Sequence, residues 1–129
     1  MSIENTQAVM KVYYDGDLSA VHEEATYKMM GTGEQVIGRE AIGEMIASFY
    51  TVPFNGRFLT VNKTYSENQA VVEGELHGEH IGEFAGVPAT GRKVKVPMVI
   101  IYDLDDELIV GARIYFLTDV FLRQVGEAS

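Results

Sequence analysis

The strongest pattern in the chain is a regular alternation of side-chain types between residues 69 and 83. Even positions carry small, apolar or histidine side chains, and odd positions carry mainly glutamate. Because successive side chains of a strand point to opposite faces, this alternation predicts one long strand with a buried face and an acidic, exposed face. Gly74, Gly78 and Gly82 fall on the buried face, where glycine relieves crowding at a bend or bulge. The sequence therefore predicts a strongly curved sheet with a hollow inner face.

Helical spacing predicts two helices before the main sheet and a short one at the end. Residues 3–14 follow Ser2, a favourable N-cap residue. Residues 38–51 carry an apolar stripe at the i, i+3, i+4, i+7 spacing, made by Ile42, Met45, Ile46 and Phe49. A last helix is expected from residue 118 to residue 126, with Thr118 as its cap.

Most of the remaining chain predicts strands. Four further runs rich in β-forming residues are bounded by glycine, proline or acidic turns, and they are residues 25–30, 57–65, 93–103 and 108–116. Helices followed by an antiparallel meander are typical of the α+β class. We therefore expect a single α+β domain over residues 1–129.

One of these strands predicts an apolar patch on the outer face of the sheet. Lys93 and Lys95 share their face with Pro97, Val99 and Ile101, and antiparallel pairing lets the lysines face the glutamates of the long strand. The apolar residues then lie outside the sheet, and an exposed apolar patch on a small domain is typical of a subunit interface. The expected partner is a second copy of the chain, giving a homodimer.

Composition excludes several classes of protein. With 129 residues, 47% of them hydrophobic and 22% charged, the chain has the size and balance of one globular domain. A net charge of −9 argues against binding to nucleic acid or to an anionic membrane. The absence of cysteine excludes disulfides, thiolate metal sites and a cysteine nucleophile, and it fits a reducing compartment. Since the start of the chain also lacks the pattern of a signal peptide, we expect a cytoplasmic protein.

His80 is the first candidate for chemistry. It lies on the buried face between Gly78 and Gly82, and a buried imidazole can hold or move a proton near neutral pH. The alternative is a core histidine bonded to a backbone carbonyl. His77 falls among glutamates on the exposed face and is expected to be solvated. Because the two histidines lie on opposite faces of one strand, they cannot converge on one ion, and no metal site is expected.

The last strand and the tail supply the other candidates. Arg113, Tyr115 and Leu117 share one face. Arg113 could orient a carbonyl or a carboxylate, and Tyr115 could donate to an oxyanion; the alternatives are an arginine that reaches the rim and a tyrosine packed in the core. Asp119 is either a base or an ordinary acid favoured by the helix dipole. Further hydroxyls come from Tyr13, Tyr14, Tyr27, Tyr50 and Tyr102, and some of these are expected to be core tyrosines with their hydroxyls at a pocket rim.

Three segments together resemble a known family. They are the strand and glycine–proline loop over residues 78–92, the segment 113–117 and the tail 121–126. The chain resembles the SnoaL-like polyketide cyclase, or ester cyclase, family of the nuclear transport factor 2-like superfamily, from about residue 13 to residue 126. The resemblance implies a cone-shaped fold, with a curved antiparallel or mixed sheet cupping a pocket closed by N-terminal helices. The loop and tail motifs are specific for the family and not for one reaction.

The resemblance also implies a site. It places the histidine segment in the pocket, with His80, Asp119, Tyr115 and Arg113 as the catalytic candidates. The residues expected to contact substrate are Leu117, Tyr27, Tyr14, Phe84, Met98 and Phe49. The family's last strand usually reads Tyr-x-Asp, and counting back from Gln124 puts that acid at position 117, where this chain has leucine. An aspartate placed there is expected to be buried, with a raised pKa.

The expected activity follows from the same resemblance. It implies cofactor-free proton transfer, of cyclase or isomerase type, on a hydrophobic small molecule that carries a carbonyl group. Two alternatives stay open. One is an enzyme resembling epoxide hydrolases on the same fold. The other is a non-catalytic module for small-molecule binding or dimerisation, which Leu117 favours because leucine moves no proton.

Overall fold

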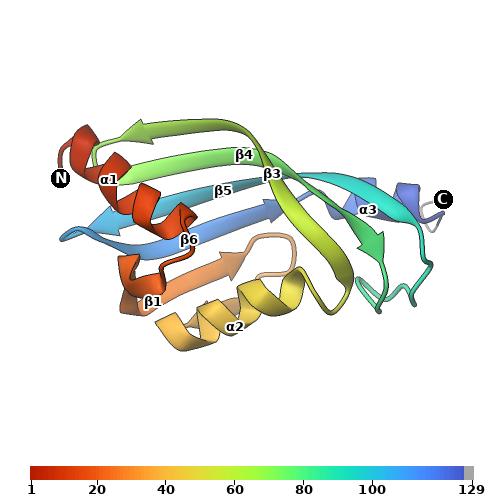
Figure 1. Cartoon of the computed structure of the whole chain (residues 1–129). Helices are drawn as coiled ribbons and strands as arrows, with labels where there is room; N and C mark the ends of the chain where they lie inside the picture. Colours follow the sequence, from red (N-terminus) through yellow and green to blue (C-terminus); the bar gives the residue numbers. More distant parts are fainter. Residues whose placement is uncertain (127–129) are drawn as a thin grey trace.

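The computed structural model describes residues 1–126 and contains three α-helices around one curved sheet (Figure 1). In chain order the elements are α1 (Ile3–Tyr14), the 3₁₀ turn η1 (Leu18–Ala20), β1 (Val21–Met29), β2 (Gln35–Ile37), α2 (Arg39–Phe49), β3 (Phe54–Ser66), β4 (Gln69–His80), β5 (Lys93–Asp105), β6 (Leu108–Phe116) and α3 (Thr118–Gln124). Residues 127–129 lie outside the described part, so the predicted end of the domain stays a prediction.

The sheet is mixed and open. Its strand order is β2-β1-β6-β5-β4-β3, in which β1 runs parallel to β6 and every other neighbouring pair is antiparallel. Helix α1 packs against β3 and β4, and α2 packs against β1 and β2. Both helices lie over the same face of the sheet (Figure 1). The predicted α+β class and cone-shaped fold are therefore confirmed.

Most predicted elements are present, with small shifts at their ends. The Ser2 hydroxyl accepts a hydrogen bond from the Asn5 amide at 3.0 Å, as expected of the N-cap of α1. The strand predicted to end at residue 83 stops at His80, because the Ile81 and Gly82 amides turn away to the Pro53 carbonyl. The short elements η1 and β2 were not predicted. Thr118 is not the N-cap of α3, which begins after Leu117 without a side-chain cap.

Glycine sets the curvature of the sheet, as the alternation predicted. Gly74 lies beneath the ring of Phe58, and a Cβ atom there would be 2.5 Å from the carbonyl oxygen of Leu59. Next to this point the pairing of β3 with β4 shifts register between Thr60 and Asn62. Gly78 faces Gly56 on β3 so closely that a Cβ would be 2.8 Å from the Gly56 Cα. The missing side chains thus let β3 bend over β4.

Helix α3 is attached to the end of the sheet by one side chain. The Gln124 amide group donates from Nε2 to the Lys95 carbonyl at 2.7 Å and accepts from the Lys95 amide at 2.8 Å. Strand β6 ends at Phe116, opposite Met98 of β5. Beyond that point the Gln124 carboxamide makes the hydrogen bonds to the β5 backbone that a neighbouring strand would make. The inner side of α3 buries Phe121 and Val125 in the core.

Candidate functional site

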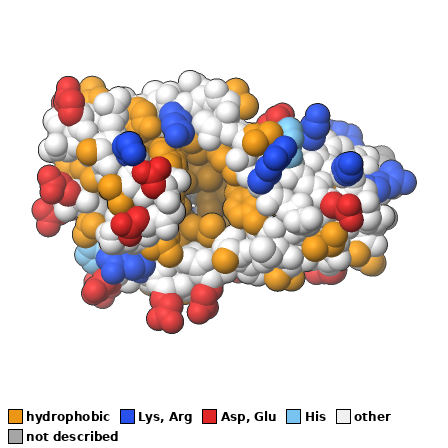
Figure 2. Space-filling model, in the orientation of Figure 1, with side chains coloured by type: hydrophobic (Ala, Val, Ile, Leu, Met, Phe, Trp, Pro, Cys, Tyr) orange, Lys and Arg blue, Asp and Glu red, His pale blue; other side chains and the backbone are white. Residues whose placement is uncertain are grey.

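A cavity of about 410 Å³ lies between the inner face of the sheet and the two N-terminal helices. The space-filling view shows a hollow bordered by hydrophobic side chains (Figure 2). Its aromatic lining consists of Tyr13, Tyr14, Tyr27, Tyr50, Tyr102, Phe49 and Phe58. The other lining residues are Gly16, Leu18, Met29, Gly43, Met45, Ile46, Ala47, Thr60, Val72, Met98, Ile100 and Ile114. Among the residues that the structure describes, none that lines this cavity is an acid, a histidine, a lysine or an arginine.

The local fold explains why these side chains converge. The helical stripe predicted for α2 puts Met45, Ile46 and Phe49 on the cavity wall. The last turn of α1 supplies Tyr13 and Tyr14.

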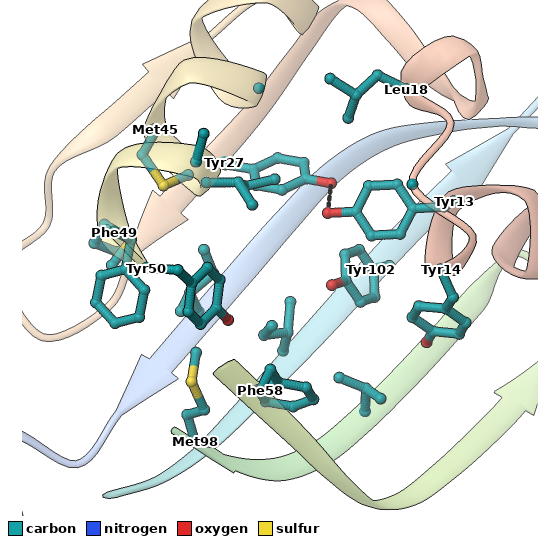
Figure 3. A pocket seen from close by; sticks show the side chains of 18 of the residues that line it. Tyr13, Tyr14, Leu18, Tyr27, Met45, Phe49, Tyr50, Phe58, Met98 and Tyr102 are labelled. Atoms are coloured by element: carbon teal, nitrogen blue, oxygen red, sulfur yellow. Dashed lines mark hydrogen bonds between the residues drawn. The ribbon is translucent and has the colours of Figure 1, made fainter. Parts of the chain in front are cut away.

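Figure 3 shows the tyrosine hydroxyls of α1, β1 and β5 toward one end of the cavity, and Met45, Phe49 and Met98 toward the other. Tyr13, Tyr14, Tyr27 and Tyr102 thus lie toward one end of the cavity, while Tyr50 lies next to Phe49, nearer the mainly apolar end (Figure 3).

Two of the hydroxyls bind each other and one has no partner. Tyr27 Oη donates to Tyr13 Oη at 3.0 Å, and the Tyr13 ring stacks edge-on against Tyr102, with centroids 5.3 Å apart (Figure 3). Tyr14 Oη is buried without a hydrogen-bond partner in the described residues. The Nζ atom of Lys63 lies 4.1 Å from the centre of the Tyr14 ring. Since buried polar groups are normally paired, this hydroxyl is an unused donor beside the cavity, and the ring must turn to bring it to a ligand.

Burial keeps the cavity tyrosines protonated. Desolvation raises the pKa of Tyr50 to about 12. It also raises the pKa values of Tyr13, Tyr14, Tyr27 and Tyr102, mainly because the charged phenolate would lose its water. At neutral pH the cavity thus offers uncharged hydroxyl groups that donate hydrogen bonds.

These raised pKa values predict a loss of stability at alkaline pH. Folding makes each cavity tyrosine bind its proton more tightly, so the contribution to stability is complete below the ordinary pKa of 10.0 and is lost as the pH rises through the folded value, about 12 for Tyr50. We expect the free energy of unfolding to begin falling near pH 10. Urea titrations at several pH values, with tyrosinate absorbance of the folded protein, would measure this. Ionisation of every tyrosine with one ordinary midpoint, before unfolding, would contradict it.

His80 is buried but does not reach the cavity. Its Nδ1 lies 2.9 Å from Thr90 Oγ1, and its Nε2 has no partner in the described residues. The imidazole packs against Phe121, with ring centroids 5.0 Å apart. It belongs to a phenylalanine cluster whose ring centroids lie 5.0–6.5 Å apart, formed by Phe49, Phe54, Phe84, Phe116 and Phe121. His80 is therefore a core histidine, bonded to a hydroxyl and not to the backbone carbonyl of the alternative reading.

The predicted orientation of the last strand is wrong. Residues Ala112, Ile114 and Phe116 of β6 are buried, so Arg113, Tyr115 and Leu117 lie on the outer face of the sheet. Tyr115 and Leu117 are 38% and 43% exposed. Arg113 pairs with Asp103 of β5, and that hydrogen bond raises the pKa of the guanidinium.

The remaining candidates divide into two groups. Asp119 is exposed in the first turn of α3, where it faces no cavity, and this position fits its alternative reading as an ordinary helix-dipole acid. Phe84 packs in the phenylalanine cluster and does not line the cavity. The other four candidates for substrate contact do line the cavity, and they are Tyr27, Tyr14, Met98 and Phe49. Their contact with a ligand stays a prediction.

One cavity residue that the sequence reasoning missed is Phe58. It shares the inner face of β3 with Thr60 and covers Gly74. The signal was indirect, because Gly74 pairs with Thr60 and is only a diagonal neighbour of Phe58, within reach of a large aromatic side chain. Among residues 1–126, no group of three histidine, aspartate or glutamate side chains is placed to hold a metal ion. No helix in that range is long and apolar enough to cross a membrane.

Comparison with known families identifies the class of protein. The model of the SnoaL-like polyketide cyclase family matches residues 6–124, nearly the whole chain, so the protein belongs to this family. A comparison with curated proteins gives no match.

Solved structures agree with this fold. A protein from Jannaschia sp. CCS1, provisionally described as a SnoaL-like polyketide cyclase, is 21% identical, with 99% of this chain and 94% of that chain covered and a TM-score of 0.79. A protein from Xanthomonas campestris pv. campestris, provisionally described as a polyketide cyclase, is 18% identical, with 95% of this chain and 98% of that chain covered and a TM-score of 0.80. A protein from Kribbella flavida, provisionally described as a ketosteroid isomerase, is 15% identical, with 88% of this chain and 78% of that chain covered and a TM-score of 0.67. At these identities the likeness is one of fold.

Proposed function

We propose that the protein binds an uncharged, hydrophobic small molecule bearing a carbonyl or hydroxyl oxygen in the tyrosine-lined cavity. The observation that carries this proposal is the combination of five tyrosine hydroxyls with a lining free of acids, histidine, lysine and arginine in the described residues. A cavity of about 410 Å³ lies within the range of small-molecule sites.

The electrostatics of the cavity select against charged ligands. An ion moved from water into an apolar cavity pays a large desolvation cost unless a partner of opposite charge receives it, and the described lining offers none. A neutral ligand with a carbonyl oxygen escapes this cost. Its oxygen can accept from the Tyr14 hydroxyl once that ring turns toward it, because the hydroxyl has no hydrogen-bond partner among the described residues. Its apolar part fits the end formed by Met45, Phe49 and Met98 (Figure 3).

Proton-transfer catalysis of cyclase or isomerase type is the second candidate, and one observation favours it. The buried Nε2 of His80 has no partner among the described residues, so it could accept a proton if a substrate reached it. The phenylalanine cluster stands in the way, since Phe49 lines the cavity while Phe54 and Phe121 contact the imidazole. Catalysis by His80 therefore requires these rings to move, whereas binding requires only a turn of the Tyr14 ring. Cofactor-free chemistry of this type would also need tyrosine donors to polarise the carbonyl.

A pair of probes tests the binding proposal. We expect an uncharged polycyclic ketone to bind, and Tyr14→Phe to weaken its binding about fivefold through the loss of one hydrogen bond. The hydrocarbon of the same shape should bind parent and variant equally, because it accepts no hydrogen bond. Fluorescence or calorimetric titration measures both. Tyr65→Phe is the control, since Tyr65 does not line the cavity. Ketone affinity that is unchanged in Tyr14→Phe would contradict the assigned donor, and failure of both probes to bind would contradict the proposed function.

The same ketone separates binding from catalysis. Exchange of its α-protons for deuterium, followed by NMR, reports enolisation directly. The binding proposal expects no acceleration above buffer. Acceleration by the parent that disappears in His80→Gln, with ketone affinity retained, would favour the catalytic candidate.

The outer face of the sheet supports a further proposal, that the protein forms a homodimer. Val99 and Ile101 of β5 are half-buried there, next to Tyr115 and Leu117 of β6. We expect light scattering at high micromolar concentration to give twice the chain mass of 14.3 kDa. Val99→Glu should reduce the mass to that of one chain, because it buries charge at the contact. Ile37→Glu on β2, a site 64% exposed, is the control and should leave the mass unchanged. A parent that scatters as a monomer would refute the dimer.

A further inference from the structure

A second hollow, of about 620 Å³, lies on the outer face of the sheet, opposite the tyrosine-lined cavity. It is formed where the ends of β3, β4 and β5 meet Gln124 of α3. Its exposed or half-buried side chains include Arg57, His77, Lys93 and Lys95, together with the acid Glu79. The hollow is thus polar, whereas the cavity on the inner face is apolar.

Three basic side chains form one row across this hollow. The register pairs Arg57 of β3 with His77 of β4, and His77 with Lys95 of β5. Directly opposed side chains of neighbouring strands lie about 4.5–5.5 Å apart at Cβ, and like charges at that spacing destabilise a sheet. When His77 is protonated it repels both Arg57 and Lys95, and Glu75, 2.9 Å from His77 Nε2, offsets that repulsion in part.

The row is poorly neutralised by the protein. His77 Nε2 lies 2.9 Å from Glu75 Oε1 on its own strand. No carboxylate oxygen of the described residues comes within 4.0 Å of the charged atoms of Arg57 or Lys95. As predicted, both lysines face the acidic strand, but only Lys93 lies directly opposite a glutamate, while Lys95 lies opposite His77. In the adjacent row, Glu79 lies opposite Lys93, so that row is balanced in formal charge.

Basic residues are concentrated at this end of an otherwise acidic protein. The chain has ten lysines and arginines and a net charge of −9. Besides Arg57, Lys93 and Lys95, the same end holds Arg92, whose Nη1 reaches the Gln124 carbonyl at 3.5 Å, and Arg123 of α3. Figure 2 shows lysine and arginine side chains gathered toward the end where α3 lies.

The backbone beneath the row is held in place. The two hydrogen bonds between Gln124 and the Lys95 backbone fix the strand at the point where it has lost β6 as a neighbour. The contact of Gly56 with Gly78 holds β3 against β4 beside Arg57 and His77. Such a scaffold holds the Cα atoms of Arg57, His77 and Lys95 at fixed spacing. Fixed spacing lowers the entropy cost of gathering the three side chains around one ligand.

We propose that the row of Arg57, His77 and Lys95 binds a single phosphate group, carried by a small molecule or free in solution. Phosphate presents several oxygens and close to two negative charges, which match the fork of Arg57 and the point charge of Lys95. Glu75 and Glu79 border the row and limit it to one anionic group. An extended polyanion such as nucleic acid would meet these acids and the net negative charge of the protein.

The test is a titration of the full chain with inorganic phosphate at constant ionic strength, followed by backbone amide NMR. We expect saturable shifts of the amides around residues 57, 77 and 95, and none around the tyrosine-lined cavity. Arg57→Gln and Lys95→Gln should each weaken phosphate binding about tenfold, because each removes a charged hydrogen-bond donor. Lys11→Gln, an exposed change of the same charge on α1, should bind phosphate like the parent.

The outcomes distinguish a specific phosphate site from non-specific electrostatic attraction of anions to basic side chains. Shifts that grow linearly without saturation, or that chloride reproduces at equal ionic strength, would overturn the proposal. So would equal affinity of the parent and Lys95→Gln. Acetate that binds as tightly as phosphate would overturn the assignment to phosphate. Spectra of the variants outside the hollow report that they are folded, since all three changes are at exposed residues.

Discussion

Replacing Gly74 with alanine should destabilise the protein by roughly 3 kcal/mol and close part of the cavity. The new Cβ would be 2.5 Å from the Leu59 carbonyl oxygen and would also collide with the ring of Phe58. A carbonyl in a strand cannot move without disturbing the hydrogen bonds of β3, so the cost is larger than for contact with a flexible side chain. Because Phe58 lines the cavity, its displacement should also weaken binding of the polycyclic ketone. Urea unfolding measures the first effect and titration the second.

Gly31→Ala is the matched control for this substitution. The nearest atom to a Cβ there is Thr118 Oγ1, at 3.9 Å, and the backbone of Gly31 is not in the left-handed region. We expect its free energy of unfolding to stay within about 0.5 kcal/mol of the parent. Equal stability of the Gly74 and Gly31 variants would mean that the bend of β3 over β4 does not depend on the missing side chain.

Much of the fold could be predicted because β4 carries an unambiguous pattern. Its inner positions, such as Val72, Leu76 and His80, are buried, while its acidic positions face outward. Such an alternation fixes the register of a strand, since a shift by one residue would bury the glutamates. The same clarity placed Met45, Ile46 and Phe49 of α2 on the cavity wall. Family membership was predicted on different grounds, from the motifs over residues 78–92, 113–117 and 121–126.

The last strand was misread because both of its faces are partly apolar. Ile109 at an odd position is buried, and so are Ala112 and Ile114 at even positions. The change of face occurs at a register shift, where Asp103 pairs with Gly111 and Leu104 with Ile109, so that Val110 is an extra residue. A β-bulge of this kind reverses which positions point inward. The one local mark is Gly111, which suggests a bulge without fixing its position.

The candidate site was predictable only in its composition. The five tyrosines were expected to contribute hydroxyls, and all five line the cavity. The separation of His80 from that cavity was not, because it depends on five phenylalanines that are distant in sequence and meet only in the folded chain. The even position of His80 in β4 therefore predicted that its side chain is buried, but not which side chains surround it.

An aspartate on the inner face of β6 should destabilise the protein strongly, whereas one just beyond the strand on the outer face should not. The two variants therefore test which face of β6 is buried. Ile114→Asp puts a carboxyl in the cavity, and we expect it to cost about 4 kcal/mol at neutral pH, because the ionised group would be buried without a partner. Leu117→Asp should change the free energy of unfolding by less than about 1 kcal/mol, since Leu117 is 43% exposed. A buried carboxyl at position 117, as the family resemblance implies, is not expected, because this position lies on the outer face of the sheet.

The pH dependence of the two variants distinguishes a buried carboxyl from mere loss of packing. Desolvation in Ile114→Asp should raise the folded-state pKa above the unfolded value of about 3.9. A raised pKa means that the protonated form is the one that folding tolerates, so the penalty is smallest near pH 4 and grows as the pH rises through the folded pKa. A loss of packing alone would cost the same at every pH. Urea titrations of parent and both variants between about pH 4 and pH 8 measure the difference. A pH-dependent penalty in Leu117→Asp, and none in Ile114→Asp, would mean that position 117 faces the cavity after all.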